Sequence, residues 1–223
     1  MVNKYTIFGH SNVGLCIILD ALYSRYAEEV EVDIISNVPE DENASLSLTY
    51  LHDGIRTSEY FHAGWNPEEH GKYILSGMTP KTKALLFKFF HDRFGIVTDQ
   101  YESVIHSIVN VCNGVQIGKG CNISPGTTLA PFANLGDFVT LNRHVSVGHH
   151  TSIGAFSSVN PGCNIGGSCK IGKYVTIGMG ASIFDHIEIG DNAVIGGGSV
   201  VTKHVPANTL VYGVPAKVVK QLH

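Results

Sequence analysis

The residues best suited to chemistry lie together in segment 143–150, whose sequence is Arg-His-Val-Ser-Val-Gly-His-His. An imidazole accepts and returns a proton near neutral pH, so a histidine here could serve as a general base. Neutral imidazole is also a common zinc ligand, and His144 and His149 are five residues apart. Which of the two roles is possible depends on how the element that carries these histidines arranges them in space.

That element is a long repeat with a period of six residues. A helix repeats at 3.6 residues and a strand at two, so a drift-free period of six predicts short strands joined by corners, as in a parallel β-helix. The residue four places after each apolar position is small or β-branched, as at Cys121, Cys163 and Cys169. The repeat positions, all Ile, Leu or Val, are Ile117, Ile123, Leu129, Leu135, Leu141, Val147, Ile153, Val159, Ile165, Ile171, Ile177, Ile183, Ile189, Ile195 and Val201.

Three six-residue units make one triangular coil, so residues eighteen apart stack about 4.8 Å from each other along the axis. We expect the apolar positions to fill the interior and the glycines that follow them to supply corner geometries. Ile105 and Val111 are in phase, so coiling is expected to begin near His106. No insertion breaks the period, which predicts a prism without a protruding loop.

Residues 1–100 differ in kind. Strand-like runs at 4–8, 30–35 and 73–77 alternate with helical patterns at 15–26 and from Thr79-Pro80 to about residue 91. Strand, glycine turn, helix and strand open a Rossmann-like α/β domain, and such a turn can hold a phosphate. Gly9 and Gly14 do not complete the dinucleotide fingerprint, so a merely tight turn remains an alternative. We expect domains at 1–100 and 101–223, and assign no role to the acidic 40–42 or to 65–67.

Composition narrows the class of protein. The 223 residues carry a formal net charge of −4, and the pI is about 6.3. This charge balance does not indicate binding to nucleic acid or to a membrane surface, both of which favour an excess of basic residues. No apolar stretch reaches membrane length and no signal peptide is evident. The odd count of five cysteines indicates thiols in a reducing compartment, so a cytoplasmic location is expected.

The whole chain resembles the sugar O/N-acyltransferases that join a small Rossmann-like N-terminal domain to a left-handed β-helix. These include the nucleotide-aminosugar N-acetyltransferases of bacillosamine and perosamine biosynthesis and the sialic acid O-acetyltransferases. The resemblance rests on the hexapeptides, on Leu141-Asn142-x5-His149 followed by Ile153-Gly154, and on the closing segments 196–201 and 213–217. The handedness comes from the resemblance.

The resemblance implies that His149 is the general base and that Asn142 lies beside the acceptor amine. The family usually has an acidic residue after the base, whereas this chain has His150. His150, Asp137 or a backbone carbonyl could orient His149 instead. The backbone N–H of Gly167, eighteen residues on, matches the group that faces the thioester carbonyl.

The remaining binding residues also follow from the resemblance. Ser158, Met179 and Gly197 correspond to positions that contact coenzyme A. In the N-terminal half, the turn Gly9-His10-Ser11-Asn12 and the pair Ser36-Asn37 correspond to the loops that bind the nucleotide sugar. His186, His204 and His223 are interpreted as surface residues.

We therefore expect an acetyl-CoA-dependent N-acetyltransferase that acts on the amino group of a nucleotide-linked aminosugar for a bacterial surface glycan such as lipopolysaccharide O-antigen. O-acetylation of a sugar or sialic acid is the main alternative. A metal site like that of gamma-type carbonic anhydrases is another, although Ile108 stands where a third histidine would be needed. A non-catalytic scaffold is the third. The family forms parallel homotrimers, and no metal is expected.

Overall fold

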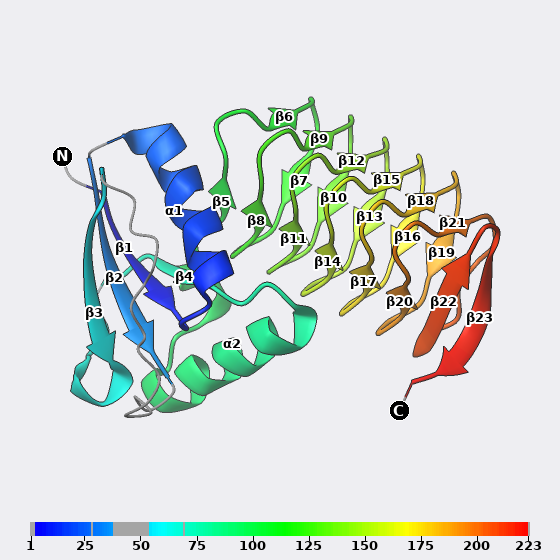
Figure 1. Cartoon of the computed structure of the whole chain (residues 1–223). Helices are drawn as coiled ribbons and strands as arrows, with labels where there is room; N and C mark the ends of the chain where they lie inside the picture. Colours follow the sequence, from blue (N-terminus) through cyan, green and yellow to red (C-terminus); the bar gives the residue numbers. More distant parts are fainter. Residues whose placement is uncertain (1–2, 28, 38–53, 69, 223) are drawn as a thin grey trace.

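The computed structural model describes residues 3–27, 29–37, 54–68 and 70–222, so the acidic segment 40–42 lies outside the described residues. The chain begins with a four-stranded parallel sheet in the order β3-β2-β1-β4 (Figure 1). Its strands are β1 (Asn3–Phe8), β2 (Val30–Ser36), β3 (Arg56–Phe61) and β4 (Tyr73–Leu75).

Three of these strands match the sequence prediction, and β3 does not. β3 lies at the sheet edge, and none of its side chains is buried. Its sequence, Arg-Thr-Ser-Glu-Tyr-Phe, lacks the apolar run of a central strand, so the periodicity gave no signal there.

Two long helices accompany the sheet, α1 (Asn12–Tyr26) and α2 (Pro80–Phe94). The Ser11 hydroxyl caps α1 by accepting from the Gly14 N–H, and the Thr79 hydroxyl caps α2 by accepting from the Thr82 N–H. α1 begins three residues earlier than its apolar pattern suggests because the capping turn itself joins the helix. Short 3-10 helices follow at η1 (His62–Gly64) and η2 (Thr98–Gln100). No described helix has the length and apolarity needed to cross a bilayer.

The rest of the chain is a left-handed parallel β-helix. Its short strands pair with those eighteen residues away, as in Asn134↔Gln116 and Asn134↔Ser152, so the unbroken period is confirmed (Figure 1). The first side holds β5 (Val104–Ile105), β8 (Asn122–Ile123), β11 (Thr140–Leu141), β14 (Ser158–Val159), β17 (Thr176–Ile177) and β20 (Val194–Ile195). The second holds β6 (Asn110–Val111), β9 (Thr128–Leu129), β12 (Ser146–Val147), β15 (Asn164–Ile165), β18 (Ser182–Ile183) and β21 (Val200–Val201). The third holds β7 (Gln116–Ile117), β10 (Asn134–Leu135), β13 (Ser152–Ile153), β16 (Lys170–Ile171) and β19 (Glu188–Ile189).

The interior of the prism is the expected column of apolar side chains. All repeat positions from Ile123 to Val201 are buried in one cluster, and Ile117 packs against it from the open end. Cys121, Cys163 and Cys169 fill the small inward positions as free thiols. Burial raises the pKa of each of these three thiols because the low dielectric disfavours the thiolate.

The corner geometry differs from the expectation. Every sixth residue from Gly114 to Gly198 has a positive φ, and nine of these positions hold a residue other than glycine. The glycines after the apolar positions serve another purpose. A Cβ on Gly154 would lie 2.6 Å from the backbone of Gly172 in the next coil. These glycines therefore permit close stacking of coils, and the left-handed residues lie two positions later.

Aromatic residues join the two halves of the chain. Phe8, Trp65 and Tyr101 belong to one buried cluster that also includes Phe138 of the β-helix. The fully buried Lys83 of α2 donates to the Phe138 carbonyl oxygen at 3.1 Å. Desolvation lowers the pKa of Lys83 to about 8. A domain division at residue 100 stays a prediction, since this cluster crosses it.

The chain ends in an antiparallel hairpin of β22 (Thr209–Gly213) and β23 (Ala216–Gln221). β22 pairs with β20 and so extends the first side of the prism (Figure 1). The hairpin lies at the far end of the β-helix from the N-terminal sheet.

Candidate functional site

His149 and His150 lie at the corner that follows β12. Both side chains are exposed, and His150 has a φ of 56°. The His149 ring leans over Gly167 in the next coil, where a Cβ would lie 2.7 Å from Nε2. The Phe132 ring packs beside His150 with centroids 5.0 Å apart. The strict period thus places both imidazoles at the outer edge of the prism.

The two imidazoles contact each other through Nδ1 atoms 3.1 Å apart. One Nδ1 must donate and the other accept. If His149 donates, its Nε2 carries a lone pair and can take a proton, while His150 fixes the tautomer. His150 is therefore the side chain that contacts His149 Nδ1, while no acidic residue follows His149 in the sequence. Asp137 lies at another corner, where its carboxylate accepts from the Lys119 N–H at 2.8 Å.

The backbone N–H of Gly167 is already engaged. It donates to the Asp185 carboxylate at 2.6 Å, and Asp185 lies one coil further along the same corner. In this arrangement the N–H does not point to an incoming oxyanion. The role of Gly167 as an oxyanion donor stays a prediction, and it would require this N–H to leave Asp185.

Asn142 lies at a different corner from His149. It follows β11, its Oδ1 accepts from the Arg143 N–H at 2.8 Å, and its side chain is half-buried. The two corners are separated by the side that contains β12, roughly 15 Å at about 3.3 Å per residue. One chain therefore does not bring Asn142 and His149 together.

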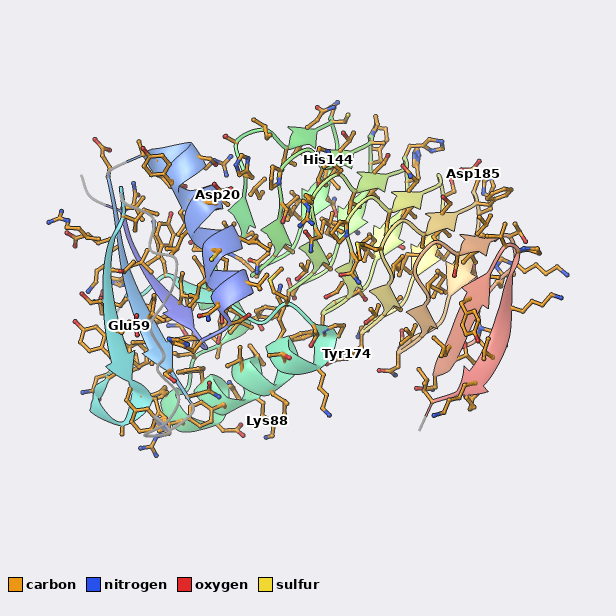
Figure 2. All side chains as sticks on the ribbon, in the orientation of Figure 1. Asp20, Glu59, Lys88, His144, Tyr174 and Asp185 are labelled. Atoms are coloured by element: carbon orange, nitrogen blue, oxygen red, sulfur yellow. The ribbon has the colours of Figure 1, made fainter. Side chains whose placement is uncertain are left out.

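His144 lies at the Asn142 corner, where its ring contacts Gly126 (Figure 2). It is thus one side of the prism away from His149, and the two histidines do not converge. Within 3–27, 29–37, 54–68 and 70–222, no group of three or more His, Cys, Asp or Glu side chains is placed to hold a metal ion.

Of the three residues expected to contact coenzyme A, Met179 and Gly197 lie next to each other, and Ser158 lies elsewhere. Met179 and Gly197 are exposed neighbours on successive coils, and the Gly198 N–H donates to the Met179 carbonyl at 2.8 Å. Ser158 is buried, and its hydroxyl donates to the Met78 carbonyl at 3.0 Å. The segment that connects β4 to α2 covers Ser158, which sequence spacing could not reveal.

The β1–α1 turn lies at the carboxyl edge of the N-terminal sheet. Gly9 has a φ of 93°, and a Cβ there would lie 2.7 Å from the Ser76 hydroxyl. The Ser11 N–H faces the same hydroxyl at 3.5 Å. Asn12 is exposed at the first turn of α1. Because β1 and β2 are parallel neighbours, Ser36 and Asn37 end beside this turn.

The side chain of His10 is largely enclosed. Its side chain is only 9% exposed, and its Nε2 lies 3.6 Å from the Glu59 carboxylate on β3. That nitrogen is buried without a hydrogen-bond partner among the described residues. The turn thus combines an enclosed imidazole with polar side chains at the carboxyl end of the sheet.

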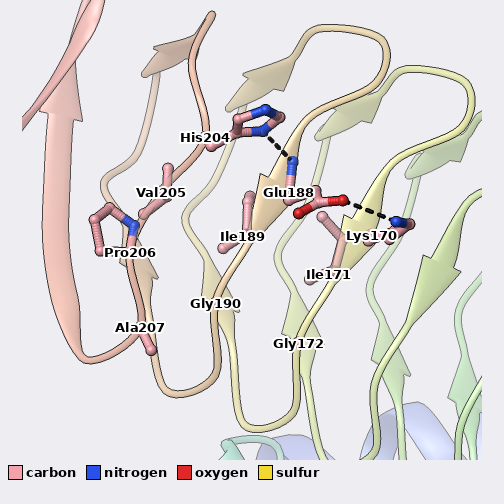
Figure 3. Close-up of a pocket in the computed structure, with 10 residues that line it drawn as sticks. All are labelled: Lys170, Ile171, Gly172, Glu188, Ile189, Gly190, His204, Val205, Pro206 and Ala207. Atoms are coloured by element: carbon pink, nitrogen blue, oxygen red, sulfur yellow. Dashed lines mark hydrogen bonds and ion pairs between the residues drawn. The ribbon is translucent and has the colours of Figure 1, made fainter.

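A groove runs along the third side of the prism beyond the His149 corner (Figure 3). It has a volume of about 470 Å³ and is lined by β16, β19 and the segment that contains His204. Lys170 Nζ lies 2.8 Å from the Glu188 carboxylate, and the Glu188 N–H donates to His204 Nδ1 at 3.0 Å. The groove offers space for an elongated ligand parallel to the prism axis.

Three residues at these sites were missed in the sequence. Asp185 lies two coils after His149, so the eighteen-residue spacing could have identified it. Ser76 lies near the carboxyl end of the expected strand 73–77, just after β4 ends at Leu75, which is the usual place for a polar residue at a site. Glu59 lies on the unrecognised β3, so no signal was present for it.

The comparisons agree with this architecture. The family model of the bacterial transferase hexapeptide (six repeats) matches residues 168–203. No curated protein matches the chain. A variant of perosamine N-acetyltransferase from Caulobacter crescentus, solved with CoA and GDP-perosamine, superposes with a TM-score of 0.77 at 20% identity, covering 99% of this chain and 98% of that one.

Two other solved structures are similar over almost their full length. The acetyltransferase domain of PglB from Neisseria gonorrhoeae has a TM-score of 0.80 at 18% identity, with 97% of this chain and 99% of that chain covered. WeeI from Acinetobacter baumannii has a TM-score of 0.75 at 22% identity, with coverages of 97% and 100%. The chain therefore has the fold of these proteins throughout, a Rossmann-like sheet followed by a left-handed hexapeptide β-helix.

Proposed function

We propose that this protein is an acetyl-CoA-dependent N-acetyltransferase that acts on the amino group of a nucleotide-linked aminosugar. The observation that carries the proposal is the exposed His149 imidazole, whose Nδ1 is held by His150 so that Nε2 is open. The full-length likeness to a perosamine N-acetyltransferase solved with CoA and GDP-perosamine supports the choice of reaction.

The reaction joins the sugar nitrogen to the acetyl carbonyl carbon and breaks the carbon–sulfur bond of the thioester. His149 Nε2 takes a proton from the amine as it attacks, which prevents accumulation of a charged nitrogen. The resulting imidazolium returns that proton to the departing thiolate. His150 Nδ1 accepts from His149 Nδ1–H throughout, so the pair needs no carboxylate to keep the reactive tautomer.

Each substrate is assigned a position relative to His149. The acyl donor lies along the prism, in line with the groove that contains Lys170. The nucleotide of the acceptor lies at the β1–α1 turn, around Gly9, His10 and Ser11. The Gly167 N–H would become an oxyanion donor only if it released the Asp185 carboxylate, to which it donates in the free chain.

The site is completed by a second copy of the chain. Asn142 and His149 lie at different corners of one prism, so an acceptor amine can meet both only where two prisms adjoin. A parallel homotrimer provides such a junction at each of its three interfaces. The free cysteines of the described chain fit a reducing compartment, and we place the protein in the cytoplasm.

The test is an acetyl transfer assay on the purified protein. GDP-, UDP- and dTDP-linked aminosugars are offered with acetyl-CoA, thiol release is followed, and the product mass is measured. We expect one nucleotide family to give an N-acetylated product. His149→Ala should lower the rate at least about a hundredfold while acetyl-CoA still binds.

His70→Ala is the matched control, because His70 is an exposed histidine remote from the proposed site. It should turn over like the wild type. Near-normal turnover in His149→Ala would reject His149 as the base. If none of the aminosugars gave thiol release, nucleotide-linked aminosugars would be rejected as the acceptor class.

A further inference from the structure

A second cavity lies at the corner of the prism that holds neither Asn142 nor His149. It has a volume of about 520 Å³, within the roughly 300–1,000 Å³ common for small-molecule sites. Figure 2 shows Tyr174 beside the N-terminal end of α2, and the cavity lies between them. Its lining residues are Thr79, Pro80, Lys81, Ala84, Leu85, Lys88, Tyr174, Thr176 and Asn192.

The cavity is at the end of an aromatic ladder. Phe138, Phe156 and Tyr174 occupy the same corner in successive coils, each with a positive φ. Phe138 and Phe156 stack with centroids 4.7 Å apart, and Phe156 and Tyr174 stack at 5.2 Å with an interplanar angle of 6°. The next position of the column is Asn192, so the ladder stops at the cavity.

Tyr174 is the open end of this ladder. Phe138 is buried beneath Phe87 of α2, whereas Tyr174 is 38% exposed. An additional planar ring packed against Tyr174 would add stacking attraction to the burial of its apolar area. The Asn192 amide beside it offers both a donor and an acceptor to the edge of such a ring.

The opposite wall is cationic. Lys81 and Lys88 are two helical turns apart on α2, on the side that also presents Ala84 and Leu85 to the cavity. Lys88 pairs with Asp92, while Lys81 is exposed and makes no ion pair with the described residues. None of the residues that line the cavity is acidic.

We propose that this cavity binds a nucleoside diphosphate, with the base against Tyr174 and the phosphates at Lys81 and Lys88. A ring face and two cations on facing walls match a ligand that is planar at one end and anionic at the other. The site lies at the third corner of the prism, away from those of Asn142 and His149. The inference therefore does not depend on the proposed reaction.

The experiment is photolabelling of the full-length protein with 8-azido-ADP, followed by mass spectrometry of its peptides. We expect saturable label on peptides that contain residues 79–88 or 174–192, displaced by ADP. Competition with CoA and with GDP shows whether the nucleotide portion of a substrate or only the free nucleotide binds. Displacement by any of these three supports the site.

Two variants test the assignment without disturbing the fold. Tyr174→Asn keeps a residue that accepts a positive φ but removes the ring, and Lys81→Glu reverses an exposed charge. Each should lower labelling of these peptides at least about fivefold, because the first removes the stacking ring and the second reverses a phosphate-attracting charge. Tyr212→Asn and Lys119→Glu alter an exposed tyrosine and an exposed lysine outside the cavity and should label like the wild type.

The proposal is overturned if the label appears only on other peptides. It is equally overturned if Tyr174→Asn and Lys81→Glu label as strongly as their controls. Loss of acetyl transfer in the separate assay has no bearing on these outcomes, so the two proposals fail independently.

Discussion

His150 follows the proposed base at the position where the resemblance would place an acidic residue, and its Nδ1 lies 3.1 Å from that of His149. A neutral acceptor fixes the tautomer of His149 but adds no negative charge beside it. A carboxylate in the same place would favour the imidazolium form of His149. The identity of residue 150 therefore bears directly on the proposed base.

His150→Asp should consequently move the acid limb of the pH profile. The carboxylate stabilises protonated His149, so the base is lost at a higher pH than in the wild type. We expect kcat/KM to begin falling at higher pH in this variant, as measured from pH 5 to 9.

His150→Asn is the matched variant, because asparagine also tolerates a positive φ but carries no charge. It should reduce kcat about tenfold without moving the acid limb upward. An identical profile in both variants would contradict an electrostatic role for residue 150.

At the scale of the elements, Lys83 connects α2 to the β-helix. Its buried ammonium is held by the Phe138 carbonyl, and burial lowers its pKa to about 8 from an ordinary value of 10.5. Between these two pH values the unfolded chain binds the proton and the folded chain does not. The free energy of unfolding therefore gains a contribution as pH rises through this window.

This predicts a pH-dependent difference between the wild type and Lys83→Met. From pH 7 to pH 9.5, the wild type should gain about 2 kcal/mol of stability relative to the variant, measured by urea unfolding. Other titrating groups are common to both proteins and largely cancel. An unchanged difference between pH 7 and 9.5 would show that Lys83 stays protonated in the folded protein.

The glycines that follow the apolar repeat positions allow a prediction about coil stacking. A Cβ on Gly154 would lie 2.6 Å from backbone atoms of Gly172, so Gly154→Ala must push two coils apart. We expect a loss of about 3 kcal/mol, seen as a lower urea midpoint.

Gly162→Ala is the contrasting change. Gly162 has a φ of 71°, but nothing lies within 4 Å of the added Cβ. It should cost only about 1 kcal/mol. Equal losses in the two variants would contradict the division of roles between the two sets of glycines.

These elements also show what sequence could and could not predict. The six-residue period specified the coils because each apolar position must face the interior of the prism. It could not assign the glycines correctly, since close stacking and positive φ both favour glycine. It also could not place Ser158, whose burial depends on the Met78 segment, nor detect β3, none of whose side chains is buried.

At the scale of the whole molecule, the separation of Asn142 from His149 is the feature with the largest consequence. A prism of eighteen residues per coil puts residues seven apart at different corners. No local adjustment of one chain can close a gap that spans a full side of the triangle. The proposed site therefore exists only where the His149 corner of one copy meets the Asn142 corner of the next.

This arrangement predicts complementation between two inactive variants. Asn142→Ala and His149→Ala should each be nearly inactive alone. When the two are co-expressed and assort at random, about a quarter of the interfaces join an intact His149 to an intact Asn142. The mixed protein should then recover about a quarter of the wild-type rate, whereas separately assembled variants mixed afterwards should not. If both residues served a site within one chain, co-expression would restore nothing, and light scattering would distinguish that result from a failure to form trimers.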